Sequence, residues 1–399
     1  MKRKEKALPE EAAKTTEKSA VMQKAEDNLN VIFAALLLTV LLFTVSILSV
    51  TAKDREYSEN ENRYLAAAPV FSADSVMDGK FMKDTEAYLS DQFFARDLLV
   101  KARTDTDIFF GKKEVNDVYI GKQHFLFEKP AAYDEERVDK TVKAIKTLRK
   151  KNPKIRTYFA LAPSASEILT DFMPANAPTQ NQTEQIQSVY DRMKKIRCID
   201  LCTPLKEAKE PTKLYYKTDH HWTANAAEIA FTQLKARMKI KSTKYTMQTY
   251  PVTNTFQGTL ASSSGLFRAQ DTISITVPEP EVKYTVTYVS ENEKRPSVFD
   301  SSKLQQKSQY DVFFGGNFAQ IRIDTSSSSK RVLLVIKDSY ANCVVPMLIP
   351  YFKSIVMVDP RYYRDDIEAT IEKEGVTDIL WLYNINTFLN DTSIANMTM

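Results

Sequence analysis

The sequence is short of glycine and histidine, and each shortage excludes a class of site. Glycine occurs only eight times in 399 residues, and the adjacent pair Gly315-Gly316 fits neither a phosphate-binding loop nor a dinucleotide-binding fingerprint. Histidine occurs three times, without the His-x-x-x-His spacing or the second histidine cluster that would complete a zinc site. The sequence therefore predicts no nucleotide cofactor and no bound metal.

Cysteine is scarce as well, and the charge is nearly balanced. The three cysteines, Cys198, Cys202 and Cys343, form no Cys-x-x-Cys motif. Buried free thiols are the favoured interpretation, although a pairing between two of them stays open. Charged residues make up 27% of the chain and the formal net charge is only +4. Such a balance is not typical of a dedicated nucleic-acid-binding protein.

One long apolar run predicts a membrane segment. Residues 31–50 carry no charge, and about twenty apolar residues suffice for a helix to cross a bilayer. Residues 1–30 are polar and mixed in charge, which predicts a disordered tail. A cleaved signal peptide stays an alternative, because Val50-Thr51-Ala52 resembles a cleavage site, but the long leading segment favours an uncleaved anchor. The basic amino terminus and the large carboxyl-terminal domain favour a single-pass protein of the cell membrane with an extracytoplasmic domain.

The rest of the chain alternates strand and helix signals. After a predicted juxtamembrane linker at 51–77, residues 78–399 are expected to form one domain. Short apolar runs alternate with amphipathic patterns, which is typical of an α/β fold with a parallel sheet flanked by helices. Residues 245–320 alternate apolar and polar positions and predict a β-rich insertion. Strands are predicted near 155–161, 198–201, 332–336, 354–358 and 378–383, and helices near 78–104, 137–150, 182–195, 224–237, 341–352 and 366–374.

Two of the three histidines stand side by side. Residues 218–223 read Thr-Asp-His-His-Trp-Thr, so that Asp219 lies two positions before His221. Histidine is the usual general base near neutral pH. The stretch indicates either a catalytic base or a hydrogen-bonded loop pair, and alone it does not decide between them. The third histidine, His124, has no carboxylate at a comparable spacing and is interpreted as structural or exposed.

A candidate nucleophile follows a buried strand more than a hundred residues later. The run at 332–336 is continuously apolar and predicts a strand buried on both faces. Lys337-Asp338-Ser339-Tyr340 follows at once, before a helical pattern. A serine between strand and helix is placed like the nucleophile of α/β hydrolases, and the N–H groups at a helix start suit an oxyanion. The Gly-x-Ser-x-Gly elbow is absent, so a simple helix cap is the alternative for Ser339.

Taken together, the two stretches resemble the DHHW protein family, whose members are similar to the SGNH-hydrolase-like domains of the alginate O-acetyltransferases. The resemblance rests on residues 219–222 and on the serine block at 337–340. Three further stretches extend it over residues 59–388: Glu61-Asn62-Arg63-Tyr64-Leu65, Tyr88-Leu89-Ser90-Asp91-Gln92-Phe93 before Arg96-Asp97, and Val118-Tyr119-Ile120-Gly121-Lys122 before Phe125-Leu126-Phe127.

The resemblance implies an SGNH-like fold and a triad in the permuted chain order Asp, His, Ser. In this triad Asp219 orients His221, His221 is the base, and Ser339 is the nucleophile that attacks an acetyl ester. The resemblance further implies O-acetyl transfer to, or ester hydrolysis on, a cell-surface or exported polysaccharide. It also implies an acyl donor delivered by a separate membrane-bound O-acyltransferase, and it implies no cofactor.

Four further residues are candidates for substrate contact. By the resemblance, His220 occupies the family's variable position and Trp222 lies beside the base. The SGNH pattern uses an asparagine as an oxyanion donor, and Asn317 either takes this role or belongs to a tight turn. Arg361 follows the strand predicted at 354–358 and either recognises a polar or anionic glycan or carries solvated charge.

Two alternatives to an enzyme stay open. Lys337 stands where the common Gly-Asp-Ser motif has glycine, which leaves the first oxyanion donor unassigned. One alternative is a non-catalytic carbohydrate-binding or assembly component of a polysaccharide modification system. The other is a membrane-anchored structural protein in which the histidine stretch only packs a loop.

Overall fold

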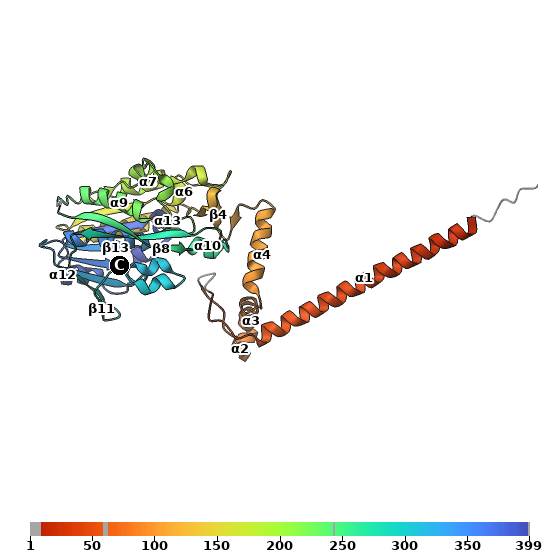
Figure 1. The fold of residues 1–399 in the computed structure, drawn as a ribbon. Coiled ribbons are helices and arrows are strands. Elements are labelled where there is room, and N and C mark those ends of the chain that lie inside the picture. The colour runs from red at the N-terminus through yellow and green to blue at the C-terminus, as the bar shows by residue number, and fades with distance from the viewer. Residues whose placement is uncertain (1–8, 59–62, 242–243, 398–399) are drawn as a thin grey trace, which may run out of the picture. The chain divides into compact units, whose positions relative to one another are not determined.

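By its internal contacts the chain divides into two compact units. The computed structural model describes residues 9–58, 63–241 and 244–397, with side chains from Met22 onward. We call residues 9–58 and 63–100 the N-terminal unit and residues 101–397 the sheet domain (Figure 1). The contact boundary therefore lies near residue 100 rather than at the predicted residue 78, because the first helix of the expected domain packs with the N-terminal segment.

One helix, α1 (Pro9–Thr51), fills the first part of the N-terminal unit. Its segment Met22–Thr51 is long and apolar enough to cross a membrane, and it is the one such helix in the described part of the chain. The structure differs from the predicted disordered tail, because the helix continues back to Pro9. Residues 9–30 are rich in alanine, glutamate and lysine, which extend a helix that the apolar segment has nucleated. The tail residues 1–8 lie outside the described residues.

Short elements complete the N-terminal unit. Strands β1 (Tyr57–Ser58) and β2 (Arg63–Tyr64) pair antiparallel, and helices α2 (Ala73–Met77) and α3 (Lys80–Asp91) follow. The helix predicted at 78–104 is interrupted at residues 92–95 and resumes as α4 (Arg96–Phe109). The interruption coincides with Ala95, whose φ of 58° lies in the left-handed region that a right-handed helix excludes.

Eight strands form the main sheet of the sheet domain, in the order β11-β10-β12-β14-β13-β15-β6-β7. The five strands from β14 to β7 run parallel, whereas β12, β10 and β11 extend this group with antiparallel pairs. The bounds are β6 (Arg156–Ala162), β7 (Arg197–Ile199), β10 (Tyr284–Tyr288), β11 (Glu293–Arg295), β12 (Gln320–Thr325), β13 (Val332–Lys337), β14 (Ser354–Val358) and β15 (Asp378–Asn384).

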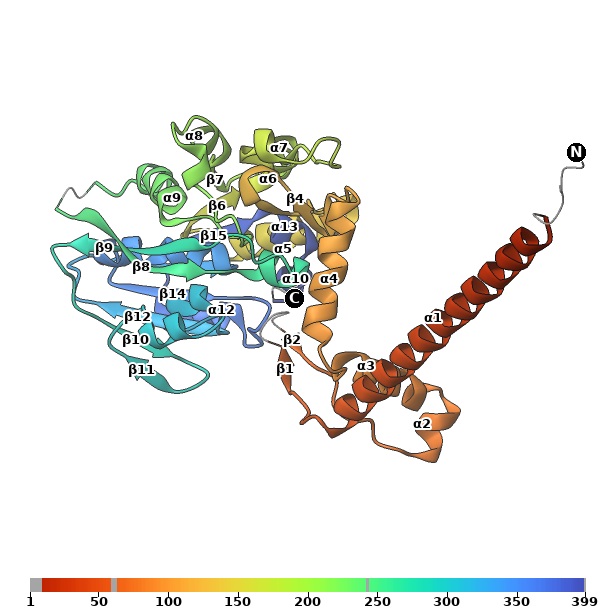
Figure 2. The same cartoon turned by 45° about the vertical axis from the view of Figure 1, so that its right-hand side comes forward.

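Helices cover both faces of this sheet (Figure 2). The parallel strands are therefore buried on two sides, which explains their continuous apolar sequence. In β13, Leu333 and Val335 belong to one apolar core, and Leu334 and Ile336 belong to the other. The helices are α5 (Glu135–Lys151), α6 (Ala165–Ile168), α7 (Gln182–Arg192), α8 (Cys202–Lys206), α9 (Ala224–Arg237), α10 (Thr259–Ser264), α11 (Val345–Leu348), α12 (Ile367–Glu374), α13 (Ile385–Asn390) and α14 (Ser393–Met397).

The insertion predicted at 245–320 contributes to the fold in two ways. Strands β8 (Thr246–Phe256) and β9 (Asp271–Glu279) form a separate antiparallel pair, with α10 between them in sequence. Strands β10 and β12 instead hydrogen-bond into the main sheet and lengthen it. A small sheet of β3 (Glu114–Val115), β4 (Val118–Ile120) and β5 (Leu126–Glu128) precedes α5. The α/β fold with a helix-flanked parallel sheet and a β-rich insertion is thus the one expected from the sequence.

Candidate active site

The histidine stretch folds into a tight loop before α9. Tyr215 and Trp222 form an isolated antiparallel bridge at the base of this loop. Asp271, at the start of β9, accepts hydrogen bonds from the backbone N–H groups of Lys217 and Thr218 at 2.9 and 2.8 Å. These contacts hold the loop at both ends, so the residues between them have little conformational freedom.

Ser339 lies at the carboxyl end of β13, where a nucleophile was predicted. It opens η6 (Ser339–Cys343), a turn of 3₁₀ helix whose N-cap residue is Asp338. The Asp338 carboxylate accepts the backbone N–H of Tyr340 at 2.9 Å and that of Asn384, at the end of β15, at 2.8 Å. The serine turn is therefore fixed to the neighbouring strand by a buried carboxylate.

The fold brings the two stretches together. His221 Nε2 lies 2.7 Å from Ser339 Oγ, and His221 Nδ1 lies 2.6 Å from Asp219 Oδ1. An ionised carboxylate has no hydrogen to donate, so Nδ1 carries the proton and Nε2 accepts the serine hydroxyl. Asp219, His221 and Ser339 thus have the mutual geometry of an orienting acid, a base and a nucleophile.

Trp222 and Tyr340 tie the same two stretches together. Trp222 Nε1 donates to the backbone carbonyl oxygen of Tyr340 at 3.0 Å, and the Tyr340 hydroxyl donates to the carbonyl oxygen of His220. Trp222 is fully buried, so the predicted contact between its side chain and substrate is wrong. The indole instead belongs to the core that sets the distance between the base and the nucleophile.

Asp219 has further partners from the insertion. Its Oδ2 accepts the backbone N–H of Thr259 at 2.8 Å and the Thr259 hydroxyl at 3.0 Å. Gly258 passes so close that a Cβ at this position would lie 2.2 Å from Asp219 Oδ2. Only glycine permits such an approach of the backbone to the carboxylate. Gly258 and Thr259 therefore hold Asp219 in place from the insertion.

The electrostatics keep the base neutral and the acid ionised. Burial and the neighbouring His220 lower the pKa of His221 to about 4, against the opposite effect of Asp219. Burial alone would raise the pKa of Asp219, but the two histidines and the hydrogen bonds from His221 and Thr259 lower it well below its usual range. At neutral pH His221 is therefore ready to accept a proton beside a negative charge, as a general base requires.

Two rings pack against the imidazole of His221. The Tyr310 ring is stacked on it, with centroids 3.8 Å apart and planes 14° apart, and the His220 ring lies 3.9 Å away. His220 Nδ1 is 2.7 Å from Thr259 Oγ1, and this hydroxyl gives its hydrogen to Asp219, so His220 is the donor of that bond. His220 therefore both lines the cavity at Ser339 and supports Asp219 through Thr259, and its contact with substrate stays a prediction.

Lys337, which replaces the glycine of the common motif, is buried and organises two amides. Its Nζ donates to Asn317 Oδ1 at 3.0 Å and to Asn342 Oδ1 at 2.9 Å, and it lies 3.6 Å from Asp359 Oδ2. An ammonium group has only hydrogens to offer, so both amides must turn their oxygens toward it. The Nδ2 group of Asn317 therefore points away from Lys337, and Asn317 lines the same cavity as Ser339.

The backbone N–H groups expected to receive an oxyanion are partly occupied. Tyr340 N–H donates to the Asp338 carboxylate, and Ala341 N–H donates to the Asp338 carbonyl oxygen at 3.3 Å. The expectation of several donors at a helix start needs correction, because the turn is short and is capped by its own aspartate. The Ser339 N–H and the Asn317 amide are the candidates that remain.

A cavity of about 250 Å³ opens at Ser339 and His221. Arg361 borders this cavity, and its guanidinium binds Asp359 at 2.8 and 2.6 Å. The arginine is thus neither freely solvated nor unpaired: about a third of its side chain is exposed, at the cavity, and the rest is held by a buried carboxylate. Arg361 therefore places a fixed positive charge at the border of this cavity, and its contact with a substrate stays a prediction.

Asp219, His220 and His221 also offer three possible metal-ligand atoms within 4.8 Å of one another. In the structure these atoms already have protein partners: His221 Nδ1 bonds to Asp219, and His220 Nδ1 bonds to Thr259. This pattern fits proton transfer, and the absence of a metal or cofactor stays a prediction. The three cysteines are unpaired, and Cys343 accepts a hydrogen bond from Trp222 Nε1 at 3.0 Å.

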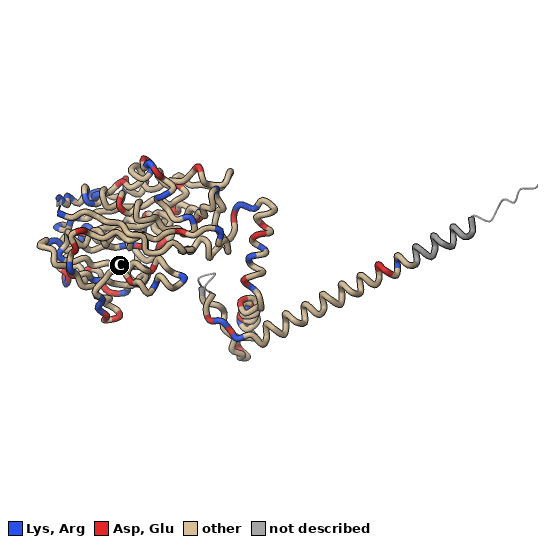
Figure 3. The backbone as a smooth tube through the Cα atoms, viewed as in Figure 1, with Lys and Arg blue, Asp and Glu red and all other residues tan. Residues whose placement is uncertain are grey.

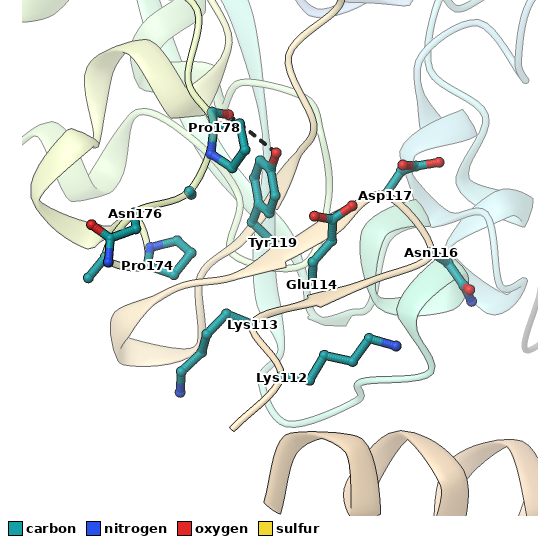
Figure 4. A pocket seen from close by; sticks show the side chains of 11 residues that line it. Lys112, Lys113, Glu114, Asn116, Asp117, Tyr119, Pro174, Asn176 and Pro178 are labelled. Carbon is teal, nitrogen blue, oxygen red and sulfur yellow. Dashed lines mark hydrogen bonds between the residues drawn. The ribbon is translucent and has the colours of Figure 1, made fainter. Parts of the chain in front are cut away.

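A second pocket, of about 510 Å³, shares no lining residue with the cavity at Ser339. It lies between the β3–β4 hairpin and residues 174–178 (Figure 4). Tyr119 closes one side and donates its hydroxyl to the Pro178 carbonyl oxygen at 3.2 Å. Two lysines and two carboxylates line it, and serine, cysteine and histidine are absent from its lining residues. The pocket therefore offers no serine or cysteine nucleophile beside a histidine base.

Sequence reasoning missed the residues that support the triad from the insertion. Thr259, Gly258 and Asp271 hold Asp219 and its loop, and Tyr310 stacks on His221. None of them belongs to a motif near the histidines. The one available signal was the scarcity of glycine, which makes each glycine in an otherwise ordered segment worth explaining.

Comparison with known proteins shows which proteins part of this chain is similar to. Residues 118–311 match a family model for the SGNH hydrolase-like domain of the acetyltransferase AlgX, a segment that includes Asp219 and His221 and ends before Ser339. The probable alginate O-acetylase AlgJ of Pseudomonas syringae pv. tomato is 25% identical over 178 residues, which cover 42% of this chain and 45% of AlgJ. AlgJ of Pseudomonas fluorescens is 24% identical over 169 residues, covering 40% and 43%. The chain thus spans less than half the length of these relatives.

Solved structures show the same fold. A DHHW family protein from Eubacterium siraeum superposes with a TM-score of 0.59 at 21% identity, covering 71% of this chain and 95% of that protein. Bacillus cereus PatB1, solved with a sulfonyl adduct, gives a TM-score of 0.58 at 19% identity, covering 69% and 98%. The resemblance predicted from the two motifs is thereby confirmed: residues 118–311 are similar to the SGNH hydrolase-like domain of AlgX, and the fold is that of the DHHW family protein.

Proposed function

We propose that this protein is an extracytoplasmic, serine-dependent O-acetyltransferase or acetylesterase that acts on a cell-surface or exported polysaccharide. The observation that carries the proposal is the hydrogen-bonded series from Ser339 Oγ through His221 to Asp219, with distances of 2.7 and 2.6 Å. The similarity to proteins named probable alginate O-acetylase supports acyl transfer as the reaction class.

In the proposed mechanism, Ser339 Oγ forms a bond to the carbonyl carbon of an acetyl ester while His221 Nε2 takes the hydroxyl proton. The tetrahedral intermediate then collapses, and the leaving alcohol oxygen receives that proton from Nε2. A sugar hydroxyl, or water, attacks the acetyl-serine, gives its proton to His221, and releases Ser339, which regains the proton. Asp219 stays ionised and stabilises the imidazolium in both halves.

The proposed oxyanion donors are the backbone N–H of Ser339 and the side-chain amide of Asn317. Lys337 supports the second assignment, because it holds Asn317 Oδ1 and thereby directs Nδ2 elsewhere. A donor fixed in advance costs no reorganisation when negative charge develops on the substrate oxygen. In this reading the lysine replaces the missing glycine of the common motif in function as well as in position.

The acyl donor is proposed to come from a separate membrane-bound O-acyltransferase, and the acceptor is proposed to be a polar or anionic glycan that meets Arg361. The helix Met22–Thr51 supports an uncleaved single-pass anchor. One span in the described part of the chain suffices for anchoring but builds no path for a donor across the membrane. We place the sheet domain outside the cytoplasm, at the cell membrane.

The test uses the full chain in detergent micelles, with a fluorophosphonate probe and 4-nitrophenyl acetate as substrates. We expect the parent protein to take up the probe and release nitrophenol, and Ser339→Ala to do neither. Ser354→Ala is the matched control, because Ser354 is a buried serine at the start of β14 that does not line the cavity at Ser339, and it should keep both activities. Thermal unfolding of each variant verifies that the fold is retained.

If the parent and Ser339→Ala are equally folded and equally inert, the acyl-transfer proposal fails. The second candidate, a non-catalytic glycan-binding component, would then be examined by calorimetry with acidic and neutral oligosaccharides. Equal labelling of the parent and Ser339→Ala would place the reactive group elsewhere and would also refute the proposal.

A further inference from the structure

One motif of the sequence takes no part in the active site. Residues 88–97, which contribute to the resemblance described above, lie at the corner between α3 and α4 in the N-terminal unit. Their polar side chains contact the segment that follows α1. Gln92 Oε1 accepts the Arg55 backbone N–H at 3.0 Å, and Gln92 Nε2 donates to the Arg55 carbonyl oxygen at 2.9 Å. Arg55 also forms an ion pair with Asp97 at 3.0 Å. The motif therefore fixes the segment that follows the apolar helix.

A further contact reaches into the apolar helix itself. The backbone N–H of Phe94 donates to Ser49 Oγ at 3.0 Å. Ser49 lies two residues before Thr51, where the segment that is long and apolar enough to cross a membrane ends. An α-helix rises about 1.5 Å per residue, so Ser49 lies about 3 Å from the end of that segment. A chain segment bonded to Ser49 must lie at the same depth, which for a spanning helix is the boundary between hydrocarbon and headgroups.

The side chains around this contact are apolar and exposed. Phe93 and Phe94 are 38% and 41% exposed, and Leu98 and Leu99 in the first turns of α4 are 66% and 52% exposed. Adjacent exposed aromatic and aliphatic side chains mark an interaction surface.

The contacts that the corner makes along the chain agree with this depth. Phe94 contacts Ser49 inside the apolar run, whereas Gln92 contacts Arg55 beyond its end, and the Tyr88 hydroxyl donates to Asp54 at 2.9 Å. The exposed apolar side chains thus lie at the level of the hydrocarbon boundary, and the charged residues Asp54 and Arg55 lie on the aqueous side. Aromatic rings with this arrangement are typical of the membrane–water interface.

We propose that the corner at residues 92–95 and the first turn of α4 sit in the lipid headgroup layer, with Phe93, Phe94 and Leu98 inserted toward the acyl chains. The occupant of this apolar surface is therefore a lipid bilayer, the same one that α1 crosses. The inference rests on the proposed anchor role of α1 and adds a second, interfacial membrane contact. Lipid binding here does not depend on the chemistry of Ser339.

The experiment measures the depth of residue 94 with the full chain reconstituted in phosphatidylcholine vesicles. The two native tryptophans, Trp222 and Trp381, are fully buried and provide a constant background in the parent protein. A Phe94→Trp variant adds one reporter. Vesicles contain lipids brominated either near the headgroup or deep in the acyl chain. We expect the added fluorescence to fall by about half with shallow bromines, to fall less with deep bromines, and to resist aqueous iodide, as for an interfacial ring.

A Phe43→Trp variant is the control for the anchor, because Phe43 lies within the apolar run and is 69% exposed to its surroundings. Deep bromines should quench this reporter most. If residue 43 is quenched while residue 94 is quenched only by iodide, the anchor stands and the interfacial inference is overturned. If neither position is quenched by bromine, α1 does not span and both proposals fall together. Quenching at both positions with the expected order of depth supports the inference.

Discussion

Lowering the pH to about 5.5 should barely slow the reaction of Ser339, although an ordinary histidine base would by then be mostly protonated. Burial and His220 lower the pKa of His221 to about 4. At about pH 5.5 a base with that pKa is more than nine-tenths neutral, whereas a base with an ordinary pKa of about 6.5 is only about one-tenth neutral. The two cases therefore differ about tenfold in rate at a single pH.

The assay is the rate of fluorophosphonate labelling of the full chain, measured at a fixed low probe concentration between about pH 4 and pH 8. The probe has no group that titrates in this range, so the profile reports the free protein. Circular dichroism at each pH verifies that the fold persists. A half-maximal rate near pH 6.5, in place of one near pH 4, would refute the reasoning about burial.

The sign of the effect of His220 is a second check on the same reasoning. His220 is, after burial, the largest cause of the lowered pKa of His221. His220→Gln removes this electrostatic effect, so the pKa of His221 should rise and the acid limb of the profile should move to higher pH. His124→Gln is the matched control, because His124 is exposed and is not among the groups that shift His221. An unchanged profile in both variants would contradict the coupling between the two histidines.

Three other predictions concern the surroundings of the triad. The pKa of His221 is lower in the folded state than in the unfolded state, so acidification from about pH 6.5 to pH 4 should reduce the free energy of unfolding by about 3 kcal/mol, measured by urea titration. Gly258→Ala should slow labelling about 100-fold, because its Cβ displaces Asp219 from His221; labelling at the parent rate would show that the loop yields. Lys337→Met should cost about 1–3 kcal/mol in urea unfolding and slow labelling, because Asn317 loses the donor that orients it; unchanged labelling would exclude this role.

The local sequence predicted those elements whose patterns are continuous. Residues 224–237 and 354–358 form α9 and β14 with the bounds expected from helical spacing and from an unbroken apolar run. The prediction of one continuous helix at 341–352 was wrong, and the reason is also local. Pro346 and Pro350 lack the N–H groups that an α-helix needs, and the segment is divided into η6, α11 and η7 (Ile349–Tyr351). The two prolines were visible in the sequence, but the prediction gave more weight to the apolar periodicity.

The site was predictable only as far as its motifs reach. Asp219, His221 and Ser339 could be selected as candidates because they lie in two unusual stretches, and the fold places them within hydrogen-bond distance. Thr259 and Tyr310 come from an insertion whose strands show only an alternation of apolar and polar residues. This alternation does not predict which turn will contact a distant loop. Such contacts depend on sheet order and on the path of the insertion, which no local pattern specifies.

The replacement of glycine by Lys337 shows how a departure from a motif is compensated in three dimensions. A buried ammonium is costly unless it is paired and hydrogen-bonded. In this structure the charge lies 3.6 Å from Asp359, and Asp359 also binds Arg361 at the cavity. The amide of Asn317 is fixed by the same lysine. The buried Asp359 carboxylate therefore stabilises two cations: Lys337, which orients the proposed oxyanion donor, and Arg361, which is proposed to meet the substrate. These two parts of the site form a single electrostatic unit rather than independent contacts.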